Sequence, residues 1–309
     1  MLLSKGYGFI DIAENIKATP NSTQFRIASL AKMFTAIQIA NLIDSNKISL
    51  NTSIDTFFND SSLKHITIRH LLSHSSGLPQ MPKYEKYGCE NEYDIEKFYN
   101  TFSSEDFTSK PDSLFSYSNY GYKILGIIIE KITSKNIIDH NQDLFNSLNM
   151  LHTTIDRNTN SDNFYHELIN NKNILAQCLD CRFKYAEGCY LSTTEDLTKF
   201  GRAILKHQII SAYHLNLFTK SQVQNSLEGK KYGLGFELGE SFVLQKKTSL
   251  QKKANILFSE YYGHRGNIPG GSAVLNIYPN QQLIIAITIN RTDIPCDLIS
   301  EKIFKILNT

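Results

Sequence analysis

Ser29 and Lys32 stand three residues apart at the start of an apolar segment that reads as a helix over residues 29–44. That spacing makes their side chains neighbours on one helical turn. A lysine among apolar side chains has a high desolvation cost and needs polar partners close by. A serine at a helix start meets free backbone N–H groups and the positive end of the helix dipole. The pair could therefore supply a hydroxyl that attacks a carbonyl, with N–H groups placed to receive the resulting oxyanion.

A Ser-x-x-Lys spacing also arises by chance, and a capping serine followed by a lysine that reaches solvent explains it as well. Two further segments make the chemical interpretation stronger. Tyr117-Ser118-Asn119 opens a second predicted helix, and the segment GHRG at 263–266 follows a predicted strand. The absence of a Gly-x-Ser-x-Gly elbow excludes the α/β-hydrolase form of serine chemistry.

The elements that must position these residues alternate in character along the chain. Apolar periodicity and turn signals predict strands at both ends and helices between them. A lone N-terminal strand needs partners, so one antiparallel sheet built from both chain ends, with a helical insertion, is favoured over two sequential domains. We expect a strand at 5–12, helices at 29–44, 66–73, 119–133 and 196–206, a hairpin at 232–245 that turns at Gly239-Glu240, strands at 273–278 and 283–289, and a helix at 296–307.

Composition excludes several other classes of function. The 309 residues carry a formal net charge of +2 without long runs of like charge, which argues against a protein that binds nucleic acid by neutralising phosphates. No apolar run reaches the length of a membrane span, and the first residues lack the apolar core of a signal peptide. No cofactor is expected.

The cysteines and one histidine pair carry weaker signals. Five cysteines are an odd number for a disulfide framework, and Cys178-x-x-Cys181 followed by Cys189 has no second ligand pair at zinc-finger spacing. Reduced thiols without a metal are therefore expected. His70 and His74 lie four residues apart without the glutamate of an HExxH motif, so helix capping or core packing is the expected use.

Six segments, in this order, resemble the penicillin-recognising serine hydrolases, in the class C β-lactamase-like branch that also contains D,D-peptidases, D-amino-acid peptidases and esterases. The resemblance covers about residues 6–290. It implies an α/β fold of the β-lactamase/transpeptidase type, with a sheet domain at 1–55 plus 200–309, a mostly helical domain at 56–199, and the active site in the cleft between them. The segments are SLAK at 29–32, ITIRHLLSHSSGLP at 66–79, FSYSNYGYKILG at 115–126, residues 188–200, YGLGF at 232–236 and GHRG at 263–266.

The resemblance assigns a role to each motif residue that this chain retains. Ser29 would be the acylated nucleophile, and Lys32 would hold its proton and stabilise charge on Ser29 and Tyr117. Tyr117 would be the general base of acylation. A free phenol has a pKa near 10, so Tyr117 needs adjacent cations, of which Lys32 is one. No glutamate matches the class A deacylation motif, so water activation would also fall to Tyr117.

The remaining motif residues would bind substrate. Asn119 would hydrogen-bond the substrate's amide, and Gly266 would keep its strand bare so that substrate lies along it. His264 stands where many relatives carry Lys in a Lys-Thr-Gly motif; it could donate to Tyr117 or to a substrate carboxylate, and it is charged only part of the time at pH 7. The backbone N–H groups of Ser29 and Asn267 would form the oxyanion hole.

Some features depart from the family pattern. Relatives begin with a helix and one more strand, a central one, ahead of the segment that follows Gly6. The localisation expected for the chain as written is cytoplasmic, and periplasmic or secreted if its N-terminus is shortened. Arg265 replaces a small or hydroxyl residue and could reach a substrate carboxylate or point into solvent. The aromatic-rich segment at 80–112 could wall a pocket or pack locally.

The sequence therefore predicts an acyl-serine hydrolase that acts on a small-molecule or peptide substrate, namely a D-amino-acid peptide, a β-lactam or a small ester. With histidine at 264, a peptidase or esterase is favoured over an efficient β-lactamase. The alternative is a catalytically inactive relative that serves as a binding or structural protein.

Overall fold

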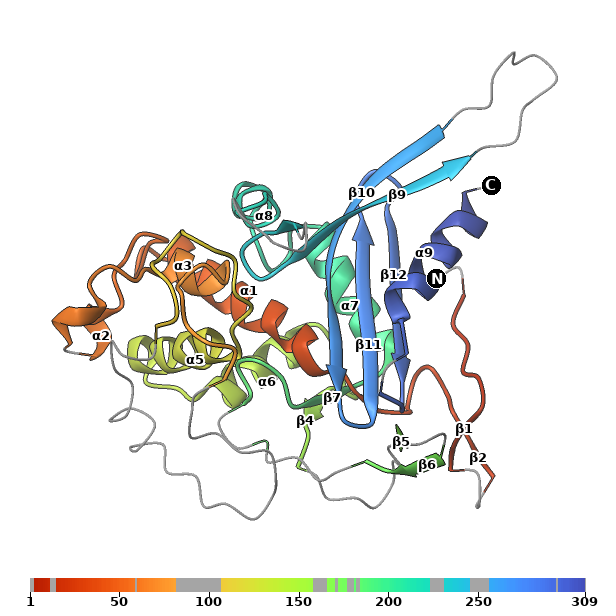
Figure 1. Ribbon diagram of the computed structural model, residues 1–309. Helices are drawn as coiled ribbons and strands as arrows, with labels where there is room; N and C mark the ends of the chain where they lie inside the picture. Colours follow the sequence, from red (N-terminus) through yellow and green to blue (C-terminus); the bar gives the residue numbers. More distant parts are fainter. Residues whose placement is uncertain are drawn as a thin grey trace.

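The fold combines a five-stranded antiparallel sheet with a group of helices packed beside it, as the computed structural model shows (Figure 1). The structure describes residues 3–11, 15–58, 60–81, 107–157, 166–169, 172–176, 181, 184–222, 231–244, 256–292 and 294–308.

The main sheet has the strand order β12-β11-β10-β9-β8, and every neighbouring pair is antiparallel. β9 and β10 extend beyond the other strands as a two-stranded arm (Figure 1). The strands are β8 (Lys231–Tyr232), β9 (Glu237–Leu244), β10 (Ile256–Ile268), β11 (Gly271–Tyr278) and β12 (Leu283–Ile289).

Two helices cover opposite faces of this sheet. α7 (Thr194–Leu205) packs on β11 and β12, and α9 (Cys296–Leu307) packs on the other face (Figure 1). Side chains of a strand alternate between faces, so Ile277 points toward α7 while Tyr278 stacks on Phe304 of α9 with ring centroids 4.2 Å apart. β11 is consequently buried along its whole length.

Helix α1 (Ala31–Asp44) lies at the centre of the molecule and contacts both α5 (Asn119–Thr133) and α6 (Ile137–Ser147). It is apolar on nearly all sides, as a buried helix should be, and most of its residues are buried. The helix starts two residues later than predicted, because Ala28–Leu30 form a tighter 3₁₀ turn. Ser29 lies in that turn, directly ahead of α1.

The other described elements are shorter. α5 and α9 have the bounds that the sequence predicts, and Ser118 caps α5 by accepting a hydrogen bond from the Gly121 N–H. The remaining helices are α2 (Asp55–Phe58), the 3₁₀ turn Ser61–Leu63, α3 (Ile68–Leu72) and α8 (Ala212–Phe218); the small sheets are β1 (Phe9–Asp11) with β2 (Ile16–Lys17), β3 (Phe25–Arg26) with β7 (Tyr190–Ser192) and β4 (Thr154–Ile155), and β5 (His166–Ile169) with β6 (Lys172–Leu175).

The N-terminal strand does not join the main sheet as expected. β1 pairs with β2 instead, and every described strand of the five-stranded sheet comes from residues 231–289. The loop between β1 and β2 is short, so the entropic cost of closing it is low when β1 pairs with the next segment. The N-terminal region meets the sheet through β3, which lies against β11 and β12, and through the 3₁₀ turn at Ala28–Leu30, which lies against β10 and β11.

The predicted hairpin has its turn at a different place. β8 and β9 are joined through residues 233–236, and Gly239 lies inside β9, opposite Tyr261 of β10. A Cβ atom at Gly239 would lie 2.3 Å from the Tyr261 ring. Gly239 therefore makes room for a cross-strand aromatic ring. The prediction of a turn at this glycine was wrong.

One large cluster of buried apolar side chains runs from α1 through α5 to the inner face of the sheet. The predicted domain boundary between residues 199 and 200 falls inside α7, and the whole of this helix packs on the sheet.

Among the helices that the structure describes, none combines the length and the apolar composition that a membrane span requires.

Candidate active site

Lys32 joins the first two motifs of the predicted site. Its Nζ atom lies 3.1 Å from Ser29 Oγ, 2.7 Å from Asn119 Oδ1 and 3.0 Å from the carbonyl oxygen of Glu187. An ammonium group has three protons, and each finds an acceptor here. The structure therefore brings Ser29, Lys32 and Asn119 together from α1, its preceding turn and the start of α5.

The environment of Lys32 shifts its protonation equilibrium toward the neutral amine. The side chain is fully buried, and this desolvation lowers its pKa from the ordinary value to about 8. The carboxylates of Glu187 and Glu237 oppose the shift in part. Near neutral pH, Lys32 can therefore exist as an amine often enough to accept a proton.

Tyr117 lies close to Ser29 and interacts with the serine side chain. The Lys32 Nζ atom lies 5.0 Å from the centroid of the Tyr117 ring. Burial raises the pKa of Tyr117 well above its ordinary value, and the interaction with Ser29 only partly offsets this. The phenol is protonated at neutral pH, so the shift moves the pKa of Tyr117 away from that of a resting base.

His264 reaches the site from β10, but its ring nitrogens contact other groups than expected. Nδ1 lies 2.6 Å from the carbonyl oxygen of Arg265 and must donate to it, so Nε2 accepts from the Tyr232 hydroxyl at 2.9 Å. Burial lowers the pKa of His264 to about 4, although Glu237 opposes the shift. His264 is therefore a neutral imidazole that is hydrogen-bonded to the Tyr232 hydroxyl. The centroid of its ring lies 6.4 Å from that of the Tyr117 ring.

Tyr232 is a site residue that sequence reasoning did not single out. It is buried, and it belongs to the YGLGF segment at 232–236, whose residue types alone indicate no chemistry. The Tyr232 ring lies close to those of Tyr117 and His264. This position depends on the pairing of β8 with β9, which no local signal predicts.

Gly266 makes a close packing contact that leaves no room for a side chain, and its predicted place along the substrate stays a prediction. A Cβ atom there would lie 2.0 Å from the carbonyl oxygen of Ile27 and 3.1 Å from the Cβ atom of Ala28. The glycine thus lets β10 pack directly on the turn that carries Ser29. Asn267 follows in the same strand, and the oxyanion hole of the Ser29 and Asn267 N–H groups stays a prediction.

Arg265 is solvent-exposed, which is one of its two predicted positions, and its guanidinium also pairs with two carboxylates. Its Nε atom lies 2.9 Å from Glu237 Oε2, and its Nη1 atom lies 3.1 Å from Asp297 Oδ2. These ion pairs lie beside a cavity of about 340 Å³ next to Tyr117. The cavity is lined by Phe115, Tyr117, Lys231, Tyr232, Glu237, Leu238, Gly239, Glu240, Tyr261, Arg265, Asn276 and Asp297.

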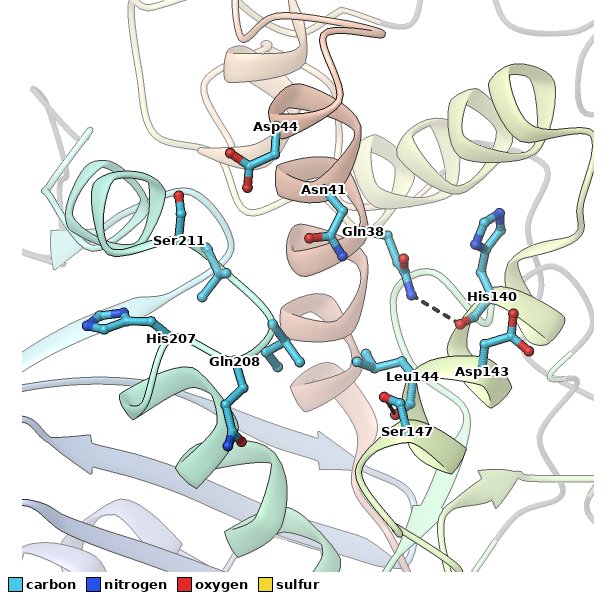
Figure 2. Close-up of a pocket in the computed structure, with 12 residues that line it drawn as sticks. Gln38, Asn41, Asp44, His140, Asp143, Leu144, Ser147, His207, Gln208 and Ser211 are labelled. Atoms are coloured by element: carbon cyan, nitrogen blue, oxygen red, sulfur yellow. Dashed lines mark hydrogen bonds between the residues drawn. The ribbon is translucent and has the colours of Figure 1, made fainter.

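A second, larger cavity of about 550 Å³ lies along the later part of α1 (Figure 2). Gln38, Asn41 and Asp44 of α1 face side chains of α6 and of residues 207–211 across it. None of the predicted catalytic residues lines this cavity.

The weaker sequence signals have structural explanations. His70 caps α3 through a capping box with Thr67, and His74 is buried. Cys181 and Cys189 are buried free thiols in contact with each other, whereas Cys178 lies outside the described residues. Most of the aromatic segment at 80–112 lies outside them as well, except Phe107, which packs on the core.

A buried helix that carries the lysine, with the serine in the turn just ahead of it and a tyrosine and an antiparallel strand nearby, is typical of the β-lactamase/transpeptidase-like class of fold. The sequence profile of the Beta-lactamase family matches residues 1–301. The chain therefore belongs to the Beta-lactamase family, as the motifs predict.

Curated relatives share part of their length with this chain. The human "Serine beta-lactamase-like protein LACTB, mitochondrial" is 27% identical in a match that covers 73% of this chain and 54% of that protein. "Protein flp" of Staphylococcus aureus (strain MRSA252) is 28% identical over 52% of this chain and 33% of that protein. The chain thus spans about half the length of the first relative and a third of the second.

Solved structures confirm the predicted fold class. The octameric penicillin-binding protein homologue from Pyrococcus abyssi superposes with a TM-score of 0.81 at 22% identity, over 99% of this chain and 70% of that one. The D-amino acid amidase from Ochrobactrum anthropi SV3, complexed with L-phenylalanine amide, gives a TM-score of 0.78 at 20% identity, over 97% and 89%.

Proposed function

We propose that this protein is a serine hydrolase that forms an acyl-enzyme on Ser29 and acts on an amide or ester. The contact that carries the proposal is the one between Lys32 Nζ and Ser29 Oγ, at 3.1 Å, made by a buried lysine whose pKa is lowered to about 8. A lysine that only reached solvent would have neither property.

The first chemical step follows from these contacts. The neutral Lys32 amine takes the Ser29 proton as Ser29 Oγ bonds to the substrate carbonyl carbon. The N–H groups of Ser29 and Asn267 stabilise the oxyanion. When the intermediate collapses, the bond to the leaving nitrogen or oxygen breaks, and the Tyr117 hydroxyl donates its proton to the leaving group. Lys32 then returns a proton to Tyr117.

The second step reverses the first with water in place of the leaving group. Water transfers a proton to the Lys32 amine as it attacks the ester carbonyl carbon. The bond between that carbon and Ser29 Oγ then breaks, Ser29 takes a proton from the Tyr117 hydroxyl, and Lys32 returns a proton to Tyr117. Asn119, whose Oδ1 accepts a hydrogen bond from Lys32 Nζ at 2.7 Å, binds the substrate's amide through its Nδ2 group in this proposal. Nδ2 also contacts the Met81 sulfur at 3.4 Å.

The charges around the site favour a peptidase or esterase over an efficient β-lactamase. A β-lactam carries a carboxylate that needs a cation or several donors. His264 is neutral, Arg265 is paired with two carboxylates, and Lys231 is paired with Glu240.

The alternative is an inactive relative with a binding or structural role. The arrangement of Ser29, Lys32 and Tyr117 argues against it, because a buried lysine is costly to keep where no chemistry needs it.

Covalent labelling distinguishes the two functions. The folded protein is incubated with a fluorescent fluorophosphonate and, separately, with a fluorescent penicillin, and the same is done with Ser29→Ala. We expect fluorophosphonate labelling that the substitution abolishes, and weaker labelling by penicillin. Ser147→Ala, in α6 on the rim of the second cavity, is the matched control and should label like the wild type. Labelling that survives Ser29→Ala, or none in the folded wild type, would refute the proposal.

A further inference from the structure

His74 lies at the centre of a group of aromatic rings that includes Tyr117, one of the proposed catalytic residues. It follows α3, is completely buried, and has a left-handed backbone with φ of 58°. The centroid of its ring lies 4.3 Å from that of Tyr117, 4.8 Å from that of Tyr232 and 5.1 Å from that of Tyr122.

Two backbone hydrogen bonds tie His74 to both sides of Tyr117. The Ser116 N–H donates to the His74 carbonyl oxygen at 2.8 Å, and the Ser118 N–H donates to the imidazole Nδ1 at 3.0 Å. The imidazole also lies against the Tyr117 ring with 35° between the ring planes. One residue thus fixes the backbone before and after Tyr117 and the orientation of its side chain.

This arrangement is costly for the fold. Because Nδ1 accepts a hydrogen bond, a neutral His74 carries its proton on Nε2. Among the described residues, that buried N–H has no hydrogen-bond partner. A left-handed backbone is uncommon at residues other than glycine, although histidine and asparagine adopt it more often than most. A buried unpaired donor on a left-handed residue beside the proposed catalytic tyrosine indicates a functional constraint better than a stabilising one.

We propose that His74 is a positioning residue that holds the Tyr117 hydroxyl on Ser29 by clamping the chain on both sides of Tyr117. The inference rests on the proposed function, since it assigns a task within the same site. The clamp needs an unprotonated Nδ1, and burial, together with the charge of Lys32, lowers the pKa of His74 well below its ordinary value.

Two variants separate the clamp from simple packing. His74→Ala removes the Nδ1 acceptor and the ring. His74→Asn removes the ring, keeps an oxygen close to the position of Nδ1, and tolerates a left-handed backbone. His214→Asn is the matched control, because His214 is also nearly buried but pairs with Asp44, about 18 Å along α1 from Lys32.

The experiment measures the saturating rate and the half-saturating concentration for fluorophosphonate labelling of Ser29, with thermal unfolding as a check on the fold. We expect His74→Ala to lower the saturating rate about 100-fold, as misplacement of a reacting group does, while the half-saturating concentration changes less than about threefold. His74→Asn should recover about tenfold of that loss, and His214→Asn should stay within about twofold of wild type.

Every other outcome contradicts either the clamp or the proposed function. A wild-type rate for His74→Ala, or His74→Asn no faster than His74→Ala, overturns the clamp. Unfolding of both His74 variants shows a structural role and overturns it too. If the folded wild type itself is not labelled, the proposed function fails; if the wild type is labelled and only the His74 pattern differs, the inference alone fails.

Discussion

Burial acts on Lys32 and Tyr117 in opposite directions on the pKa scale, for one reason. Desolvation disfavours the charged form of each group, so it lowers the pKa of the ammonium and raises that of the phenol. Both groups are thereby moved toward their neutral forms. A neutral amine accepts a proton and a neutral phenol donates one, which assigns Lys32 to the proton of Ser29 and Tyr117 to the leaving group in the proposed mechanism.

The rate of Ser29 labelling should depend on pH through the Lys32 amine. Since its pKa is about 8, the amine fraction and the rate should rise about tenfold per pH unit below pH 8 and level off above it. The measurement is the fluorophosphonate labelling rate from pH 6 to pH 10, with the hydrolysis of free probe as the control. A rate that is flat across this range would contradict Lys32 as the base.

Removal of the Tyr117 hydroxyl tests the proton donor. Tyr117→Phe keeps the ring against His74 and Lys32 but cannot protonate a leaving group. We expect kcat for an amide or ester substrate to fall about 10²- to 10⁴-fold, as for a lost acid or base. Tyr213→Phe, on an exposed tyrosine of α8, should have no effect. Unchanged turnover would show that Lys32 transfers the proton alone.

At the scale of elements, the close packing of β10 on the turn that carries Ser29 depends on Gly266. The missing side chain brings the strand with His264 against Ile27 and Ala28. The site is therefore assembled by direct contact between a strand and a 3₁₀ turn, not by side chains that reach across a gap.

Substitution of Gly266 should disturb both stability and labelling. A Cβ atom 2.0 Å from a backbone oxygen forces β10 and the turn apart, so Gly266→Ala should lower the free energy of unfolding by about 1–3 kcal/mol. Labelling of Ser29 should slow in the folded variant. Gly121→Ala in α5 meets only ordinary contacts and should be neutral or stabilising. Urea denaturation compares the two, and equal effects would contradict the packing argument.

At the scale of the whole molecule, a buried ion pair connects distant parts of the chain. The Nε atom of Arg26, in β3, lies 2.7 Å from Oδ2 of Asp156, the residue that follows β4. Its Nη1 atom donates a hydrogen bond at 2.8 Å to the carbonyl oxygen of Pro269, between β10 and β11. Both side chains of the pair are almost fully buried. Arg26 therefore connects three segments separated by more than a hundred residues each.

Loss of one partner should leave a buried charge without compensation. Arg26→Met should lower the free energy of unfolding by about 3–5 kcal/mol, and Arg26→Met combined with Asp156→Leu should recover part of it. Arg202→Met on the exposed surface of α7 should change stability by no more than about 0.5 kcal/mol. Denaturant unfolding measures all three, and an Arg26→Met effect as small as the control would refute the assignment.

The sequence by itself determined the helices and strands whose signals are local. α5 begins at Asn119 because Ser118 caps it, and the burial of α1 follows from apolar residues on all sides. The order of the motifs was enough to predict the family, and the spacing of Ser29 and Lys32 was enough to predict their contact.

Only the tertiary structure decided what depends on segments far apart in the chain. It paired β1 with β2, buried His264 against Tyr232, placed Arg265 between two carboxylates and brought His74 behind Tyr117. Burial and hydrogen-bond partners set the pKa of a group, and both come from residues remote in sequence. Residue types therefore predict which chemistry is available, whereas the fold determines which group holds the proton.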